Sequence, residues 1–359
     1  MILLSSLFLQ GCFFQDQNST IHHEDTRFMM DTIVTIETTG KSEDTLKSTT
    51  DKAFAAFQEI ADETDSYAPH GPKDLYAINE KAGTGPQKAA PHLLAILKSA
   101  ASHPHQELSL TLGPVIKIWN DNREKKTVPS RAEIADALTL TKGSRVRIDE
   151  TTGTLTLMPG TQIDLGAVAK GYAVEEAAKV LQKEGGFQTA LINAGGNIKV
   201  LGEKPDHKPW RIGIQDPKDP EKVLGTLSVP PGTAIATSGD YQRYYEVSGV
   251  RYHHILNPQT GWPSRNAHSV TVVTQSAFWA DFYSTLLFVM TPKDAMTLVE
   301  NNPSLEMVYQ DLDGTLHISS GLKDLFVQGQ SRRFSCAKMM DGSLPSWLLQ
   351  PYSASSSSI

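Results

Sequence analysis

Two side chains that carry hard oxygen atoms, Asp281 and Thr285, stand four residues apart in the segment SAFWADFYSTLLFVM. This spacing predicts that both lie on one face of a helix. A carboxylate and a hydroxyl, completed by backbone carbonyls, waters and substrate phosphates, are the ligands that Mg²⁺ prefers. Such a pair more often belongs to a solvated helix face. A metal site is favoured here because the neighbours are apolar: Trp279, Phe282, Leu286, Leu287 and Phe288.

A candidate anion site lies in the segment TQIDLGAVAKGYAVEEA. The pattern predicts a strand that runs through Gly166 into a helix, where N-terminal amide groups and Lys170 could meet a pyrophosphate. The glycine spacing excludes a P-loop. An ordinary strand-to-helix junction with an exposed lysine explains this segment equally well.

A pair of histidines, His253 and His254, precedes a turn-like stretch that ends at Gly261. At a strand end, one imidazole is expected to point inward and the other outward, so one of them is a candidate general base. A structural role is about as probable as a catalytic one. Asn193 and Asn197 flank a pair of glycines, where a ligand could approach, although a turn between two strands is the commoner explanation.

The elements that must position these residues are helices and hairpins in alternation. Helical spacing or capping signals predict helices over residues 42–65, 91–102, from 130 onward and 167–184. Alternating patterns around Gly153 and Gly314 predict two hairpins. We therefore expect an α+β fold with antiparallel or mixed sheets and packed helices.

The composition fits a sizeable globular protein. The 359 residues include 39% apolar and 20% charged residues, which is enough for one large domain or two closely joined ones. The formal net charge of −7 argues against a nucleic-acid partner, since such proteins usually display a basic surface.

The N-terminal stretch MILLSSLFLQGC is apolar and ends in a sequence that resembles a bacterial lipobox. We expect residues 1–11 to be a signal peptide, with its usual basic start missing, Cys12 to be lipidated and residues 12–25 to form a tether. The catalytic domain is expected over residues 26–335, followed by an extension over 336–359 that ends in serines. A disulfide with Cys336 is not expected.

Several motifs together resemble the ApbE family, the FAD:protein FMN transferases, over about residues 26–330. Met30-Asp31-Thr32 stands where the family has Met-Gly-Thr, and Asp65-Ser66-Tyr67 matches its Ser-x-Tyr block. The others are LSLTLGPVIKIWN, IDLGAVAKGYA, NAGGN, ATSGDYQRYY, YHHILNPQTG and ADFYSTLL.

The resemblance implies that FAD binds as substrate in a cleft between two subregions. The flavin contacts carried over are Met30, Tyr67, Leu108, Ser109, Leu110, Asp164, Lys170 and Ile255. The implied Mg²⁺ ligands are Asp281, Thr285 and the Ala167 carbonyl, with Ser284 nearby.

In the implied reaction, His254 takes the proton from a threonine or serine hydroxyl of an acceptor protein, and FMN is transferred as AMP leaves. Implied acceptors are periplasm-facing subunits of the Na⁺-translocating NADH:quinone oxidoreductase or of Rnf-type complexes. A lipid anchor would hold the enzyme on the periplasmic side of the inner membrane, beside such partners.

Three departures from the family pattern bear on flavin affinity. Asp31 replaces a glycine, Ser109 replaces an aspartate and Asn257 replaces an aspartate found in many members. Asp tolerates a positive φ better than most residues, so the turn at Asp31 can survive. We expect flavin affinity to be the property most affected.

Other functions remain open at this level. A Mg²⁺-dependent FAD pyrophosphatase would use the same residues with water as the nucleophile. A flavin-binding lipoprotein without chemistry is disfavoured, because it needs neither a base nor a metal pair. A flavin oxidoreductase is disfavoured further, since no G-x-G-x-x-G follows a strand.

Overall fold

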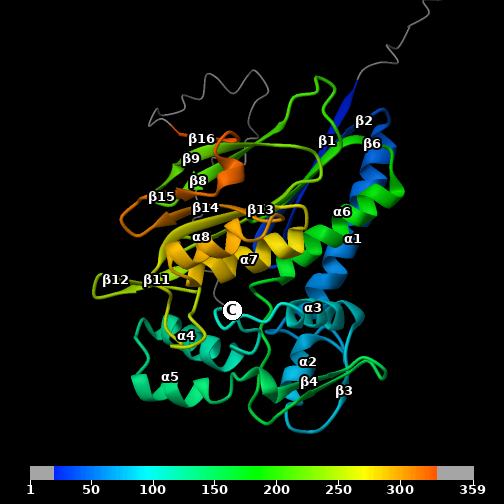
Figure 1. The fold of residues 1–359 in the computed structure, drawn as a ribbon. Helices are drawn as coiled ribbons and strands as arrows, with labels where there is room; N and C mark the ends of the chain where they lie inside the picture. Colours follow the sequence, from blue (N-terminus) through cyan, green and yellow to red (C-terminus); the bar gives the residue numbers. More distant parts are fainter. Residues whose placement is uncertain (1–19, 330–359) are drawn as a thin grey trace, which may run out of the picture.

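An eight-stranded antiparallel sheet organises the computed structural model, which describes residues 20–329 (Figure 1). Its strand order is β1-β2-β6-β7-β10-β13-β14-β15, and every pair of neighbours is antiparallel. The strands are β1 Ile21–Met29, β2 Thr32–Gly40, β6 Phe187–Ala194, β7 Asn197–Leu201, β10 Ala234–Gly239, β13 Ala267–Thr274, β14 Glu306–Asp311 and β15 Leu316–Ile318.

Helices cover one face of this sheet. They are α1 Glu43–Thr64, α6 Ala169–Glu184, α7 Ala277–Val289 and α8 Pro292–Glu300. The predicted limits of α1 and the predicted end of α6 are confirmed: the Ser42 side chain caps α1, and α6 ends at Gly185 with a φ of 68°. Helix α6 begins at Ala169, two residues later than predicted. Apolar side chains of α1 and α6 pack on β2 and β6, with Phe54, Phe57, Ile36 and Ile192 at the centre of this core.

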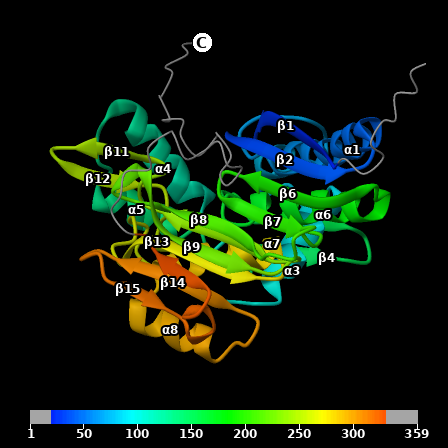
Figure 2. The ribbon, with the colours of Figure 1, turned by 90° about the horizontal axis from the view of Figure 1, so that it is seen from above.

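A small sheet covers part of the opposite face. It has the order β16-β9-β8, with β8 Trp210–Asp216, β9 Asp219–Val229 and β16 Phe326–Gln328, and it lies across the large sheet in Figure 2. Leu227 and Ile212 from this sheet pack against Val200 and Val308 of the large one. The large sheet is thus buried on both faces in this region.

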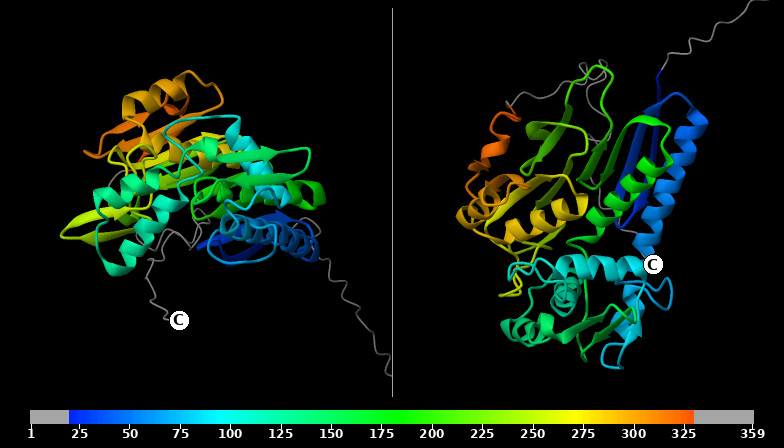
Figure 3. Two further views of the ribbon diagram at one scale, coloured as in Figure 1. Left: turned by 90° about the horizontal axis from the view of Figure 1, so that it is seen from below. Right: turned by 45° about the vertical axis from the view of Figure 1, so that its right-hand side comes forward.

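The second subregion is formed by the chain between α1 and α6 and lies below the large sheet in Figure 1 and in the right-hand view of Figure 3. It contains α2 Leu75–Glu80, α3 Pro91–Ala101, α4 Gly113–Lys125, α5 Arg131–Leu138 and a sheet of β3 Gln87–Lys88, β5 Thr154–Leu157 and β4 Val146–Asp149. The capping box of α5 and the hairpin around Gly153 are confirmed. One apolar core joins both subregions, since Leu93 and Leu155 cluster with Phe282 and Val270.

The α+β fold with antiparallel sheets and two joined subregions is therefore confirmed, but its N-terminal limit is not. β1 begins at Ile21, so residues 21–25, predicted as tether, pair with β2. The sequence did not indicate this strand because its residues are mostly polar. In an edge strand such as this one, only alternate residues are partly buried, so few apolar side chains are needed.

The structure describes neither Cys12 nor the predicted segments 1–11 and 336–359, which lie outside residues 20–329. Within the described range, no helix has the length and apolar character needed to cross a bilayer.

Candidate active site

One part of the candidate site lies at the first turn of α6 and in the loop before it. The loop before it is held by Asp164, whose Oδ1 accepts a hydrogen bond from the Gly166 amide at 2.9 Å. Lys170 lies one turn further on and donates from Nζ to the Gly166 carbonyl at 3.3 Å. Burial raises the pKa of Asp164, and the positive charge of Lys170 opposes that rise.

Helix α7 meets α6 at Gly171. The Gly171 amide donates to Oδ2 of Asp281 at 2.8 Å, so a carboxylate from α7 caps one of the amides that a helix N-terminus leaves unpaired. A Cβ on Gly171 would lie 2.3 Å from the Ala277 carbonyl oxygen and 2.5 Å from Cβ of Asp281. Only glycine therefore lets the two helices approach this closely. Burial raises the pKa of Asp281, whereas Lys170 lowers it.

Hydroxyl and amide side chains surround Asp281. Ser284 Oγ donates to the Asp281 carbonyl at 2.9 Å and lies 2.9 Å from Ser238 Oγ, and Thr285 Oγ1 lies 3.3 Å from the same Ser238 oxygen. Asn197 hydrogen-bonds to Asp281, and its own Oδ1 is buried without a hydrogen-bond partner. An orphaned buried oxygen beside a carboxylate suits a hard cation such as Mg²⁺.

The two histidines differ as predicted. His253 is buried, with Nε2 donating to the Ser264 carbonyl at 2.8 Å and Nδ1 accepting from the Ile255 amide at 3.3 Å. His254 is exposed, and its Nδ1 donates to the Arg243 carbonyl at 3.2 Å. This contact fixes the tautomer in which Nε2 carries a lone pair and can accept a proton.

The electrostatic surroundings keep His254 neutral. Desolvation by the protein around the ring, followed by the positive charges of Arg243 and Lys170, lowers the pKa of His254 to about 3. His254 is nevertheless exposed, so its ring lies at the edge of the site, with protein atoms on one side and solvent on the other. The charges of Arg243, which contacts His254, and of Lys170 therefore both act on this ring.

The turn between β1 and β2 retains its shape despite the departure at Asp31. Met30 and Asp31 have φ values of 50° and 56°, which make a tight two-residue hairpin connection. A positive φ is unusual for a bulky side chain such as Met30, and the two-residue turn requires it here. Arg243 donates from Nη2 to the Asp31 carbonyl at 3.4 Å, and Nη1 lies 3.8 Å from Asp31 Oδ2.

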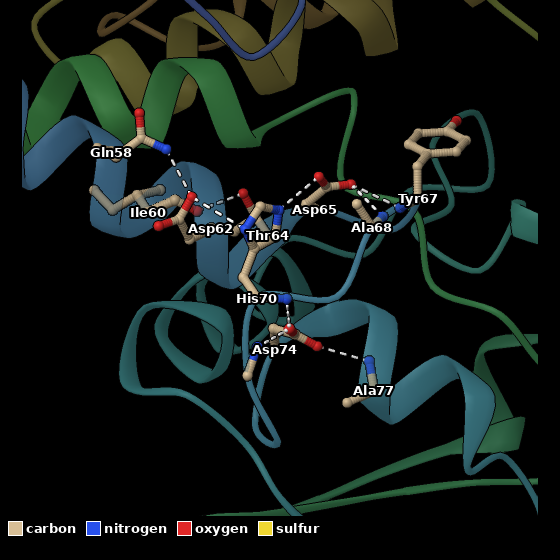
Figure 4. Close-up of polar contacts among 11 residues, drawn as sticks. Gln58, Ile60, Asp62, Thr64, Asp65, Tyr67, Ala68, His70, Asp74 and Ala77 are labelled. Carbon is tan, nitrogen blue, oxygen red and sulfur yellow. Dashed lines mark hydrogen bonds and ion pairs between the residues drawn. The ribbon is translucent and has the colours of Figure 1, made fainter. Parts of the chain in front are cut away.

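Tyr67 lies on the loop after α1, which polar contacts hold in place (Figure 4). Asp65 Oδ1 accepts from the Tyr67 amide at 2.7 Å, and Asp74 accepts from the amides of His70 and Ala77. Tyr67 is 65% exposed, while its hydroxyl lies 3.4 Å from Asp164 Oδ2. The loop thus presents an aromatic ring beside the start of α6.

The segment 108–110 also lies beside the loop that precedes α6. The Asp164 amide donates to the Leu110 carbonyl at 2.9 Å. Ser109, which replaces the family aspartate, lies 2.9 Å from Thr111 Oγ1 and accepts from the Thr111 amide, so it holds the local turn. The remaining predicted contacts pack on one apolar cluster that contains Ile255: Met30, Leu108, Leu110 and Ala167.

The structure thus brings the sequence-predicted residues together, and it adds two that sequence reasoning did not assign. Arg243 gave no signal beyond its place in ATSGDYQRYY, and Asn197 was noted only as part of a glycine-rich turn. One other group with metal-ligand spacing, Glu59, Glu63 and His92, occurs among the described residues. Glu63 there accepts from the His92 amide at 2.9 Å and stabilises the start of α3, which explains it structurally.

Comparison with known proteins places this geometry in a family. The model of the ApbE family matches residues 30–309. The chain belongs to the ApbE family. It is similar to the FAD:protein FMN transferase of Klebsiella pneumoniae (strain 342), with 33% identity over 68% of this chain and 76% of the relative. The FAD:protein FMN transferase of Vibrio cholerae is 31% identical over 74% of this chain and 81% of its own length.

Solved ApbE structures agree with this assignment. The ApbE protein of Thermotoga maritima superposes with a TM-score of 0.76 and 29% identity, covering 85% of this chain and 99% of the other. The apo form of the flavinyl transferase ApbE of Pseudomonas stutzeri gives a TM-score of 0.73 and 26% identity, covering 87% and 98%. The resemblance inferred from the motifs is confirmed.

Proposed function

We propose that the protein is a Mg²⁺-dependent FAD:protein FMN transferase that links FMN to a threonine or serine hydroxyl of an acceptor protein and releases AMP. The observation that carries the proposal is the neutral His254, whose Nε2 is free to take a proton in the same neighbourhood as Lys170. The names of the relatives support the same activity.

The chain's own residues divide the work of this reaction. His254 accepts the hydroxyl proton on Nε2 while the hydroxyl oxygen bonds to the phosphorus of the FMN half. The bond from that phosphorus to the bridging oxygen breaks, and AMP leaves with the oxygen. Lys170 and the amides at the start of α6 stabilise the charge that develops on the phosphates.

A bound Mg²⁺ would supply further charge neutralisation at the pyrophosphate. The residues that would hold it are Asp281, Thr285 and the Ala167 carbonyl, with Ser284 nearby. Asn197 adds the orphaned oxygen beside Asp281. The donor set fits this ion, since it contains no sulfur or imidazole ligand.

The flavin itself is proposed to lie between the two subregions. Tyr67 and Asp164 would contact it from one side, with Met30 and Ile255 on the other. Acceptors of the class found in Na⁺-translocating NADH:quinone oxidoreductase or Rnf-type complexes, a lipid on Cys12 and a periplasm-facing position belong to this proposal as well. A tether of lipid and polypeptide would hold the enzyme beside such membrane partners.

FAD pyrophosphatase activity is the second candidate, and one observation favours it. His254 reaches solvent, so a water molecule can occupy the position of the acceptor hydroxyl. The nucleophile then decides between the two activities, while the same residues bind and activate FAD.

The deciding experiment is the intact mass of a purified acceptor domain after incubation with the protein, FAD and Mg²⁺. We expect a gain of one FMN on a threonine or serine, lost with EDTA and in Asp281→Ala. A variant on an exposed face, Lys179→Ala, serves as the control that retains transfer. Free FMN and AMP with an unmodified acceptor would instead establish the pyrophosphatase.

A further inference from the structure

The guanidinium of Arg243 stands at the site without a structural task that requires its charge. Its contacts to Asp31 are long, 3.4 Å to the carbonyl and 3.8 Å to the carboxylate, and both groups are substantially exposed. Exposed pairs of this kind contribute little to stability. A guanidinium has five N–H donors, so most of them are available to a ligand.

Two hydrogen bonds from His254 fix the backbone carbonyl of Arg243. The Arg243 carbonyl accepts from the backbone amide of His254 at 3.1 Å and from its Nδ1 at 3.2 Å. The side chain meanwhile reaches the Met30-Asp31 turn, whose left-handed residues present the Asp31 carbonyl to it. Arg243 is therefore held between the base and the β1–β2 hairpin.

We propose that Arg243 binds a phosphate of the substrate. In the free protein Asp31 orients the Arg243 guanidinium, and it competes with the phosphate for that guanidinium. This inference rests on the proposed function, because the phosphoryl group attacked by the hydroxyl must lie beside His254. The guanidinium fork suits two phosphate oxygens, and Lys170 provides the second positive charge of the neighbourhood. Asp31 is a departure from the family glycine, so the competition belongs to this chain.

The test compares FAD with riboflavin, which carries the flavin but no phosphate. Flavin fluorescence titrations in Mg²⁺ should show that Arg243→Gln weakens FAD binding about tenfold or more, and riboflavin binding less than twofold. Arg243→Lys should restore part of the FAD affinity because it keeps the charge. Asp31→Asn should tighten FAD binding a fewfold and leave riboflavin unchanged. Arg211→Gln, an exposed arginine on β8, is the matched control and should alter neither.

The experiment distinguishes failure of the Arg243 proposal from failure of the proposed function. Equal losses of FAD and riboflavin in Arg243→Gln would mean that the residue only maintains the fold, and no loss of either would mean that it does not meet the phosphate. Both results overturn this inference while leaving the transferase intact. A wild-type protein that fails to bind FAD would overturn the proposed function and the inference with it. Binding without transfer would overturn the function alone, since the titration needs no turnover.

Discussion

At the scale of single residues, the proposed role of His254 as the general base predicts how activity should depend on pH. Its imidazole accepts a proton only when neutral, and its pKa is lowered to about 3 in the free protein. Because kcat/KM reports the free enzyme, its acid limb should fall well below the ordinary histidine value of about 6.5. Negative phosphates oppose the charges of Arg243 and Lys170, so the acid limb of kcat should lie at higher pH than that of kcat/KM.

Steady-state profiles between pH 4 and 9 would check this expectation, with His254→Ala as the control. General-base loss should lower kcat by about 10²–10⁴-fold. Any acid limb that persists in this variant belongs to other groups, of which Asp164 and Asp281 have raised pKa values. A wild-type kcat/KM limb centred near 6.5 would contradict the electrostatic account of His254.

Some residue roles could be predicted from the sequence and others could not. The pair Asp281 and Thr285 follows from helical spacing, and the inward and outward histidines follow from the alternation of a strand end. The role of Asp281 as a cap on α6 does not follow, because it depends on a contact 110 residues away in the chain. Arg243 could not be assigned for the same reason, since its partner Asp31 lies 212 residues away.

At the scale of elements, the junction of α6 and α7 should be the most sensitive point of the site. Gly171→Ala would push Cβ into the Ala277 carbonyl and Asp281, so the helices must separate and the Gly171–Asp281 hydrogen bond must lengthen. We expect a loss of about 1–3 kcal/mol in the free energy of unfolding together with weaker Mg²⁺ binding. Urea unfolding and isothermal titration with Mg²⁺ would measure both.

Gly143→Ala is the matched control, because a Cβ there meets nothing within 4 Å and its φ is not positive. It should change neither quantity. Wild-type stability in Gly171→Ala would show that the two helices can separate freely, and the close approach would then not position Asp281. The sequence predicted both helices and the cap of α6 at Gly185, but not that a glycine in the first turn of α6 sets their distance.

At the scale of the whole molecule, the folded unit extends beyond the part that carries the family motifs. The family match begins at residue 30, whereas β1 occupies Ile21–Met29 and pairs with β2 along its full length. Its polar, alternating sequence is typical of an edge strand and lacks the apolar run that identifies buried strands. Sequence reasoning therefore predicted the fold class that the structure shows, but it placed the start of the domain at residue 26, inside this strand.

This strand should matter for stability, because it ties the hairpin at Met30 to the rest of the sheet. Met29 is buried, and the Arg27 guanidinium lies 4.1 Å from the centre of the Phe54 ring on α1. A chain lacking residues 1–29 should lose at least about 2 kcal/mol, or roughly 4–8 °C in melting temperature, from the burial of Met29 alone. A chain lacking only residues 1–19 should melt like the full chain. If both truncated chains melt alike, β1 adds nothing to the fold, and the turn at Met30-Asp31 must be held by Arg243 and β2 instead.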